Sequence, residues 1–422
     1  NGTIVPGGNP REGARSSEFP TPPLQTTYGA TLFEKAAREV GFNPYPAPAA
    51  NTSQPYTNPY GVRLGPCNFC GFCENYGCYM YSKASPQTTI LPVLLKKPNF
   101  ELRPHSYVVK VNLDSDGKKA TGVTYIDAQG REVEQPADLV IMAAYQMHNV
   151  RLLLLSGIGK PYDPKTGEGV VGKNYAYQMN GAVNVLLPKG TQLNPFIGTG
   201  AGGVSMDDLN GDQFDHGPLG FIGGASIRHV RTGGRPIKMT PSVPGTPSWG
   251  SKWKAGVTDA YQRFMTIGIS GSVMSYRDAC LDLDPTYKDA YGVPLLRMTF
   301  DWHDNEYAML GYMGDRMEAV GRAMNPEKVF RAIRKKGTHY DTRIYQSTHT
   351  TGGAIMGTNP SNSVVNKYLQ SWDVSNVFVM GASAFPQNMG YNPTGVVAAL
   401  AYWSAKAIRE QYLKNAGPLV QA

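Results

Sequence analysis

Four of the five cysteines in this 422-residue chain lie within twelve residues, in the stretch CNFCGFCENYGC. They are Cys67, Cys70, Cys73 and Cys78, with the spacing C-x2-C-x2-C-x4-C. Disulfides need paired Cα atoms about 5.5 Å apart, which would make tight and strained loops at these separations. A structural zinc site usually takes two CxxC pairs that lie about a dozen or more residues apart. An iron-sulfur cluster accepts thiolates from one wrapped loop, so the spacing favours a cluster over both alternatives.

The spacing leaves the type of cluster open. Four thiolates can hold a 4Fe-4S cluster, whereas three would suit a 3Fe-4S cluster and leave one cysteine spare. Gly71 and Gly77 are expected to allow the positive-φ conformations that wrapping around a cluster needs. Either cluster would transfer single electrons, so another part of the chain must act on an organic substrate.

Two stretches near the C-terminal end carry side chains suited to that task, THTTGGAIMG and GASAFPQNMGYNPTG. Oxidation of an alcohol needs a base for the hydroxyl proton and an acceptor for the hydride. His349 suits the first role, because imidazole has an ordinary pKa of about 6.5, and the Asn392 amide can hold the same hydroxyl. Each has a structural alternative: Asn392 and Pro393 are typical of a helix N-cap followed by proline, and His349 could be an ordinary core or surface histidine. Three histidines outside such motifs are expected to be structural: His216, His229 and His303.

Hydropathy patterns predict a mixed α/β (α+β) fold that positions these residues. Apolar residues recur at helical spacing in TLFEKAAREVG, in HNVRLLLLS, from Asn305 to Met324 and from about Pro393 to Tyr412. Residues 99–144 alternate polar and apolar side chains between turn signals, which predicts a β-meander that ends in a buried strand, DLVIMAA. Residues 170–300 are rich in Gly, Pro and Asp around short β-like runs, which is typical of a sheet domain with large loops.

Composition excludes several classes of protein. With 41% hydrophobic residues the chain can bury one large core or two moderate cores, and no run of about eighteen apolar residues predicts a membrane span. The net charge of +8 comes from basic residues that are spread along the chain, without the aromatic and basic platform of RNA-binding sheets. We therefore expect no nucleic-acid binding, although the positive field could attract an anionic small molecule or an acidic partner. The start NGTIVPGGNPREGARSSEFPTPP has no apolar signal-peptide core and resembles a connector.

Three separated stretches resemble the glucose-methanol-choline (GMC) flavin oxidoreductases: RLLLLSGIG, the pattern H-x-x-G-x-x-x-M-G that begins at His349, and GASAFPQNMGYNPTG. The resemblance implies a two-domain fold, with a partial FAD-binding domain and an antiparallel-sheet substrate domain. It implies that His349 and Asn392 form the catalytic pair beside the flavin. The FAD contacts that it implies fall on Val108, Gly381, Ala382, Asn392, Pro393 and Thr394.

The sequence departs from the family pattern at several positions. Thr350 stands where the family has Pro, Gly353 where it has Thr, and Gly381 where it has Asp. His148 and Asn149 occupy the family's Gly-Ser-Pro turn. These departures leave the catalytic pair intact and bear on the contacts to the flavin and its ribityl chain.

The nucleotide-binding fingerprint G-x-G-x-x-G has one match, at Gly198, Gly200 and Gly203 in FIGTGAGGV. No buried strand precedes it and no amphipathic helix follows, so we expect a loop rather than an FAD site. The chain is then expected to lack the first part of its FAD domain, either as a fragment or because another piece supplies it. FAD binding is accordingly an expectation for the intact enzyme.

Within the family, the cysteine stretch together with IVPGGNPREGARS and KASPQTTILPVLL resembles the large flavoprotein subunits of bacterial membrane-bound sugar and sugar-acid dehydrogenases. The resemblance is chiefly to the gluconate enzymes, and the fructose enzymes are similar. The resemblance implies FAD, a 3Fe-4S cluster on the cysteine loop, a multihaem cytochrome c subunit, a small accessory subunit and quinone as the final acceptor. The expected reaction is oxidation of D-gluconate to 2-keto-D-gluconate, in a periplasmic complex attached to the inner membrane through its partner subunits. The alternatives are a fructose, sorbitol or 2-ketogluconate dehydrogenase of the same family, or a non-catalytic iron-sulfur or zinc-binding fragment.

The resemblance also divides the chain into five segments. They are an irregular arm with one helix (1–64), the iron-sulfur loop (65–85), an FAD-domain segment (86–165), a substrate-binding sheet domain (166–348) and a C-terminal return to the FAD domain with the catalytic motifs (349–422).

Overall fold

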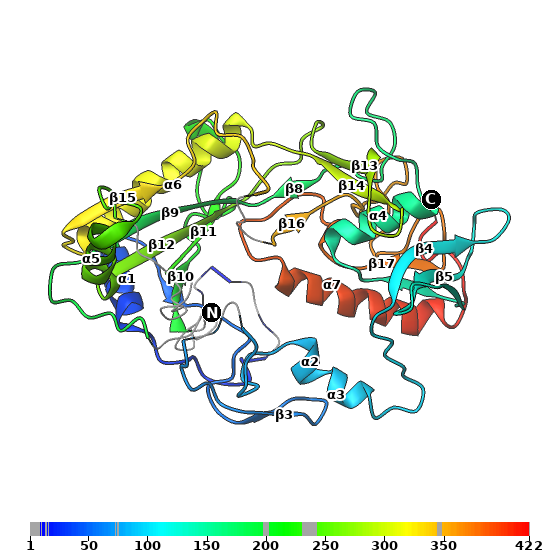
Figure 1. Ribbon diagram of the computed structural model, residues 1–422, viewed down its shortest axis with the longest axis horizontal. Coiled ribbons are helices and arrows are strands. Elements are labelled where there is room, and N and C mark those ends of the chain that lie inside the picture. Colours follow the sequence, from blue (N-terminus) through cyan, green and yellow to red (C-terminus); the bar gives the residue numbers. More distant parts are fainter. Residues whose placement is uncertain are drawn as a thin grey trace. The chain divides into compact units, whose positions relative to one another are not determined.

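The computed structural model describes residues 9, 11–12, 15, 17–71, 73, 76–196, 202–229, 243–343 and 348–421. The chain forms two compact units, each built from three separate stretches of sequence (Figure 1). Unit 1 comprises Asn1–Leu102, Asn180–Gly271 and Tyr307–Lys336. Unit 2 comprises Arg103–Met179, Ser272–Glu306 and Gly337–Ala422.

The core of unit 1 is a six-stranded sheet with the strand order β1-β10-β11-β12-β9-β15. Its strands are β1 (Tyr45–Pro46), β9 (Met179–Leu186), β10 (Val204–Met206), β11 (Ala225–His229), β12 (Phe264–Gly271) and β15 (Lys328–Ala332). The pairs β1–β10, β10–β11, β11–β12 and β9–β15 are antiparallel. The sheet agrees with the β-like runs that the Gly- and Pro-rich middle of the sequence predicts.

Three helices accompany this sheet, α1 (Tyr28–Glu39), α5 (Gly250–Tyr261) and α6 (Asp304–Ala323), and α1 and α6 confirm predicted helices. Helix α1 buries Ala30, Phe33, Ala36 and Ala37, the face that its three- and four-residue periodicity predicts. Helix α6 lies on β9 and β15, where Gly181 and Gly321 leave room for its close approach. Helix α5 was not predicted, because it lies inside the Gly-, Pro- and Asp-rich stretch that was expected to form strands and large loops; it buries only Ala260.

The remaining elements of unit 1 are short. Strands β2 (Tyr56–Thr57) and β3 (Arg63–Leu64) form an antiparallel pair in the irregular N-terminal arm. The cysteine stretch follows β3 and precedes two single-turn helices, α2 (Pro86–Thr89) and α3 (Leu91–Leu94). A 3-10 turn, η2 (Gly217–Leu219), lies in the loop before β11.

Unit 2 contains the predicted meander, an antiparallel sheet of β4 (Tyr107–Leu113), β5 (Ala120–Ile126) and β6 (Glu132–Pro136). The predicted buried strand is β7 (Val140–Met142), which pairs in parallel with β17 (Val377–Val379) rather than with the meander. The buried Asn376 side chain connects the two sheets: it pairs with both backbone groups of Ala120 at 2.8 Å and donates to the Asp138 carbonyl at 2.9 Å.

Helix α4 (Gln146–Ser156) confirms the helix predicted from HNVRLLLLS and ends at Gly157, whose φ is +67°. It packs on β4, on the hairpin of β13 (Cys280–Lys288) and β14 (Pro294–Thr299), on β16 (Thr350–Thr351) and on the 3-10 turn η3 (Ala382–Ala384). Strand β16 pairs antiparallel with β8 (Ala176–Tyr177). Helix α4 therefore contacts several of the segments that carry predicted site residues.

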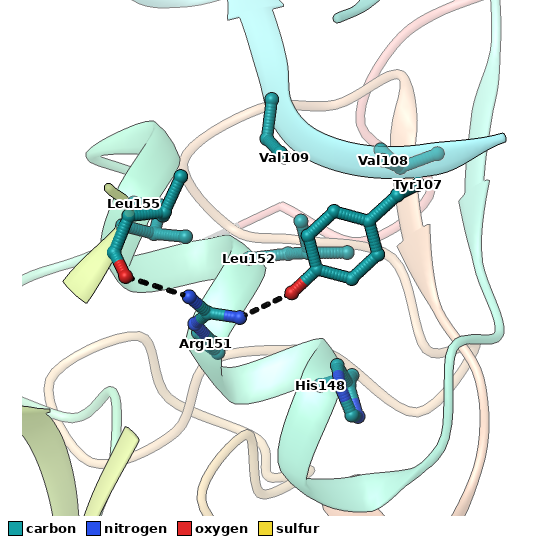
Figure 2. A pocket seen from close by; sticks show the side chains of 8 residues that line it. Tyr107, Val108, Val109, His148, Arg151, Leu152 and Leu155 are labelled. Carbon is teal, nitrogen blue, oxygen red and sulfur yellow. Dashed lines mark hydrogen bonds between the residues drawn. The ribbon is translucent and has the colours of Figure 1, made fainter. Parts of the chain in front are cut away.

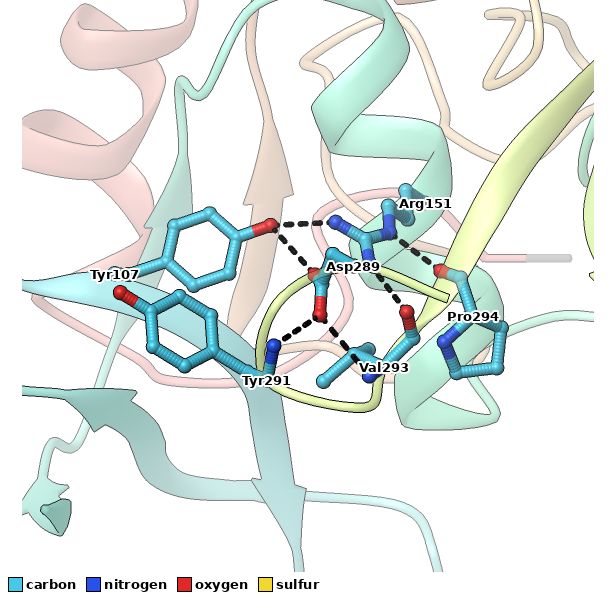
Figure 3. A network of polar contacts seen from close by, with 6 residues as sticks. All are labelled: Tyr107, Arg151, Asp289, Tyr291, Val293 and Pro294. Carbon is cyan, nitrogen blue, oxygen red and sulfur yellow. Dashed lines mark hydrogen bonds and ion pairs between the residues drawn. The ribbon is translucent and has the colours of Figure 1, made fainter. Parts of the chain in front are cut away.

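A buried ion pair fixes α4 to the hairpin (Figure 3). The Arg151 guanidinium donates to Asp289 at 2.7 Å, to the Tyr107 hydroxyl at 2.5 Å and to the Val293 and Pro294 carbonyls at 3.1 and 2.8 Å. Partial burial raises the pKa of Asp289, but hydrogen bonds from Arg151 and from two loop amides outweigh it and hold that pKa below 3.8. The network thus joins β4, α4 and the hairpin loop through one charged pair with saturated hydrogen bonds.

Helix α7 (Thr394–Ala407) continues into a π-helical turn, η4 (Ile408–Tyr412), which confirms the long C-terminal helix. Only Ser404 and Ala407 are buried within α7, whereas Ile408 and Tyr412 pack with Phe378 of β17. Across the described ranges no helix combines the length and apolar content that a membrane span requires.

Candidate active site

His349 comes directly before β16 and its ring is half-buried. Its Nδ1 atom lies 2.7 Å from Oε1 of Gln178, a fully buried residue that directly follows β8. Because β8 and β16 pair antiparallel, with Tyr177 opposite Thr350, their ladder brings Gln178 and His349 together. The backbone continues this register, since the backbone N–H of Gln178 donates to the His349 carbonyl at 3.3 Å.

The Gln178 amide can be oriented from its partners. Its Nε2 donates to the carbonyls of Met389 and Tyr391 at 3.0 and 3.2 Å. Carbonyl oxygens only accept hydrogen bonds, so the NH2 group must face them and Oε1 must face His349. An amide oxygen also only accepts, which places the ring proton on His349 Nδ1 and leaves Nε2 as the basic nitrogen of the neutral imidazole.

The backbone next to Asn392 is tied to Gln178, because Gln178 Nε2 donates to the carbonyl of the preceding Tyr391 at 3.2 Å. The Asn392 side chain is exposed. Helix α7 begins at Thr394 with Pro393 in the N-cap position, and no side chain caps it. Proline has no side-chain acceptor and Pro393 is itself in a helical conformation (φ −73°, ψ −17°), so the N-cap alternative for Asn392 stays open.

Asn388 fixes the backbone at His349. Its Nδ2 donates to the His349 carbonyl at 2.9 Å and lies 3.3 Å from the Thr351 hydroxyl. Asn388 is buried and forms a backbone bridge with Val273. Both sides of the His349 segment are thus held by buried amide side chains, Gln178 and Asn388.

The predicted flavin contacts Gly381 and Ala382 lie where β17 gives way to η3. Gly381 has a φ of +117°, in a region that favours glycine. Nearby, the fully buried Asn149 accepts from the Ala144 amide at 2.9 Å and donates to the Met380 carbonyl at 2.7 Å. Asn149, a departure from the family turn, thus ties the start of α4 to the end of β17.

Val108, the third predicted flavin position, lies on β4 with 36% of its surface exposed. It borders a small pocket between β4 and α4 (Figure 2). His148, the other departure in the family turn, reaches the same pocket from α4. The pocket is also lined by Tyr107, Val109, Arg151, Leu152, Leu155 and Val293.

The cysteine loop belongs to unit 1, and its four thiols are half-buried. Three sulfur atoms receive N–H donors: Cys67 from the Phe69 amide at 3.5 Å, Cys78 from the Lys83 amide at 3.5 Å and Cys73 from Asn51 Nδ2 at 3.8 Å. None of the five cysteines, all in the described ranges, forms a disulfide.

The backbone of this loop follows the sequence prediction in part. Phe69, Gly71 and Tyr81 have positive φ values of 56°, 80° and 55°, whereas Gly77 does not. The Lys83 ammonium donates to the Tyr76 carbonyl at 2.8 Å and to the Cys73 carbonyl, which stabilises the wrapped loop. Among the described residues, no three His, Cys, Asp or Glu side chains are arranged to hold a metal ion.

Sequence reasoning missed Gln178, Asn388 and the bridging role of Asn149. Gln178 stands alone between two short strands, so no local pattern marks it. Asn388 lies inside the PQNMGYNPTG stretch, where a second amide close to Asn392 was the available signal. Of the expected Gly-rich loop, Gly198 and Gly200 lie outside the described residues, and Gly203 accepts a backbone hydrogen bond from Ala47 at 3.0 Å.

Comparisons with known proteins show which family the chain belongs to. Family models described as GMC oxidoreductase match residues 33–180 and 276–401. The chain is 59% identical over 416 residues to the gluconate 2-dehydrogenase flavoprotein of Pantoea cypripedii, across 99% of this chain and 68% of that protein. It is 23% identical over 404 residues to the fructose dehydrogenase large subunit of Gluconobacter japonicus, across 93% of this chain and 68% of that protein.

Among solved structures, pyridoxine 4-oxidase from Mesorbium loti has a similar fold, with a TM-score of 0.55 at 14% identity. The similarity covers 93% of this chain and 72% of that one. The family models and the close relative over nearly the whole chain show that this protein belongs to the GMC oxidoreductase family.

Proposed function

We propose that this chain is the flavoprotein part of an FAD-dependent dehydrogenase that oxidises D-gluconate at C2 to 2-keto-D-gluconate. The observation that carries the proposal is the 2.7 Å contact between His349 Nδ1 and Gln178 Oε1, because it leaves Nε2 as the basic nitrogen of the ring. The 59% identity to a gluconate 2-dehydrogenase flavoprotein supports the substrate. The net charge of +8 is compatible with an anionic sugar acid.

In this reaction the two predicted catalytic residues have complementary tasks. His349 Nε2 takes the proton of the C2 hydroxyl, and Gln178 keeps the resulting imidazolium oriented by accepting from its Nδ1–H. The Asn392 amide holds the same hydroxyl without competing for its proton. Together they orient the substrate C–H bond and leave the proton on a defined atom.

Family membership supports FAD as the cofactor, which when bound supplies the hydride acceptor. The chain fits such a group, because α7 begins without a side-chain cap next to Asn392 and its positive end suits negative charge on the ring. Thr394 and Pro393 would lie at the ring end, and Gly381, Ala382 and Val108 would contact the rest of the cofactor. The proposal assigns residues 86–165 and 349–422 to FAD binding and residues 166–348 to substrate binding.

The cysteine loop is proposed to hold an iron-sulfur cluster, of the 3Fe-4S type, that supplies single-electron transfer. Its support is the four-thiol spacing; the N–H donors to Cys67, Cys73 and Cys78 are of the kind that set the reduction potential of a bound cluster. The remaining thiol is that of Cys70. The proposed partners are a multihaem cytochrome c subunit and a small accessory subunit, in a periplasmic complex attached to the membrane through those partners; the large-subunit name of the fructose dehydrogenase relative favours such partners.

The catalytic assignment is tested in the full-length enzyme by gluconate-dependent reduction of an artificial electron acceptor. We expect His349→Asn to lower kcat by about 10²- to 10⁴-fold, the contribution of a positioned general base. The matched control is His339→Asn, since His339 is an exposed histidine of the same unit whose side chain is 86% accessible. Wild-type turnover in the His349 variant would refute the assignment. A higher kcat/KM for fructose, sorbitol or 2-ketogluconate than for gluconate would favour the alternative substrates.

The cluster is tested separately by iron and sulfide analysis and by the visible spectrum. Iron with acid-labile sulfide and a flavin band supports the proposal, whereas zinc without flavin supports a non-catalytic fragment. Replacing each of the four cysteines by serine in turn identifies the ligands, because loss of a ligand lowers the bound iron and loss of a spare thiol does not. Cys280→Ser is the control outside the loop.

A further inference from the structure

Tyr145, the residue directly before α4, has φ 73° and ψ 155°. This conformation is essentially restricted to glycine, because a Cβ crowds the neighbouring backbone there. A bulky aromatic residue in it is therefore an outlier that local sequence preference does not explain. Such strain persists only where the surroundings enforce it, and it is concentrated at functional sites.

The surroundings do enforce it on both sides of the residue. The Tyr145 carbonyl accepts from the Asn149 amide at 2.9 Å, and the Asn149 side chain accepts from the Ala144 amide at 2.9 Å. The next residue, Gln146, is buried and donates to the Gly352 carbonyl at 2.8 Å. Glycine would meet these backbone demands without strain, so the side chain must be the reason for a tyrosine here.

That side chain reaches the two residues that flank His349. The Tyr145 hydroxyl lies 3.1 Å from the Thr350 hydroxyl and 3.5 Å from the Thr348 carbonyl. The Tyr145 side chain is exposed, with 47% of its surface accessible, so burial of the ring does not account for its retention. The strained backbone instead places the Tyr145 hydroxyl in contact with the residues on either side of His349.

We propose that Tyr145 is a positioning residue for His349, an inference that rests on the proposed function of His349 as the base. Gln178 and Asn388 hold the ring and the carbonyl of His349, and Tyr145 contacts the Thr348 carbonyl before it and the Thr350 side chain after it. Together these contacts set where Nε2 stands relative to the substrate hydroxyl. The strained backbone of Tyr145 then lowers stability locally and in return fixes the position of His349.

The test compares two variants of the full-length enzyme. Tyr145→Phe removes only the hydroxyl, and Tyr145→Gly removes the side chain and relieves the strain. We expect Tyr145→Phe to lower kcat for gluconate about tenfold while KM changes less than about twofold, because substrate binding is not altered but the base is displaced. We expect Tyr145→Gly to lower kcat at least as far with an unchanged or raised Tm. In both variants the amides of residues 348–352 should exchange hydrogen faster than in the wild type.

The control is Asn325→Gly, which places glycine at an exposed positive-φ position of unit 1 (φ 50°) and should leave kcat unchanged. The inference is overturned if both Tyr145 variants keep kcat within about twofold of the wild type, if Tyr145→Gly loses Tm along with kcat, or if only KM rises. If His349→Asn loses its kcat for gluconate but both Tyr145 variants keep theirs, this inference fails and the proposed function stands. An active His349→Asn removes the proposed function, and this inference with it.

Discussion

The role of Gln178 can be tested with the substitution Gln178→Met, which keeps the length and approximate volume of the side chain and removes its carboxamide. Three hydrogen bonds are lost, to His349 Nδ1 at 2.7 Å, to the Met389 carbonyl at 3.0 Å and to the Tyr391 carbonyl at 3.2 Å. At about 0.5–1.5 kcal/mol for each bond, the free energy of unfolding should fall by about 2–4 kcal/mol.

The effect on catalysis should exceed what this loss of stability explains. Without an acceptor at Nδ1, the neutral imidazole no longer has a preferred tautomer, and the proton can occupy the Nε2 atom that must act as the base. We expect kcat for gluconate to fall by about 10²-fold in the folded variant, which is part of the total contribution of a general base. Urea unfolding measures the first effect, and dye reduction under conditions where the variant is fully folded measures the second.

Gln370→Met is the matched control, because Gln370 is also buried in unit 2 and its Nε2 also donates to two carbonyls, of Ser375 at 2.6 Å and of Gly417 at 2.8 Å. Its Oε1 also accepts from the Leu419 backbone N–H at 2.7 Å and from Asn366 Nδ2 at 3.1 Å, so the control should lose at least as much free energy of unfolding and keep its kcat. If Gln178→Met is destabilised but turns gluconate over as fast as Gln370→Met does, the orientation of His349 does not depend on Gln178 and the reasoning fails.

Three further predictions concern stability and reactivity. The folded pKa of Asp289 is lowered, so its carboxylate contributes stability above pH ~3.8 that is lost as the pH falls through the lower folded value. At pH 7, urea unfolding of Asp289→Asn should therefore give a free energy of unfolding about 1–3 kcal/mol below that of the wild type, and this difference should shrink below pH ~4. A difference that does not change with pH would contradict the ion-pair explanation. Gly352 has φ +84°, and a Cβ there would stand 1.9 Å from the Asn174 carbonyl oxygen, so Gly352→Ala should lower the free energy of unfolding by more than about 3 kcal/mol. Gly311 faces open space on α6, so Gly311→Ala should be neutral or stabilising. Calorimetry of both variants checks this, and equal Tm values for Gly352→Ala and Gly311→Ala would count against the packing described at Gly352. Burial raises the pKa of the Cys280 thiol, so mass spectrometry should find it unmodified after native treatment with iodoacetamide at pH 8, and rapid labelling would show that this strand opens readily.

Local sequence patterns predicted the elements whose stability is local. Helices α1, α4 and α6 begin and end within a few residues of their predicted limits, because an apolar stripe and a terminal signal mark each of them. The meander was equally clear from its alternation and turns. Helix α5 lies inside the Gly-, Pro- and Asp-rich stretch, whose composition is typical of loops, and it buries only Ala260.

The parts of the site that depend on distant pairing could not be predicted in this way. His349 and Asn392 were recognisable from their motifs, but the residue that joins them, Gln178, is separated from His349 by 171 positions. Only the antiparallel pairing of β8 with β16 brings these two side chains together. In the same way, the strand predicted at the end of the meander gave no sign that its partner would be β17.

The way the chain divides between its two units has a consequence for synthesis on the ribosome. Each unit is assembled from three stretches that are separated in the sequence, and unit 2 is complete only when Gly337–Ala422 has been made. Strand β7 therefore has no β17 to pair with until translation reaches Val377–Val379. Its residue Ile141 is 47% exposed even in the folded protein. At about 5–20 residues per second this delay lasts on the order of ten seconds or more, which makes the nascent chain a strong client for chaperones. It also means that neither unit can be expressed alone as one uninterrupted stretch of the gene.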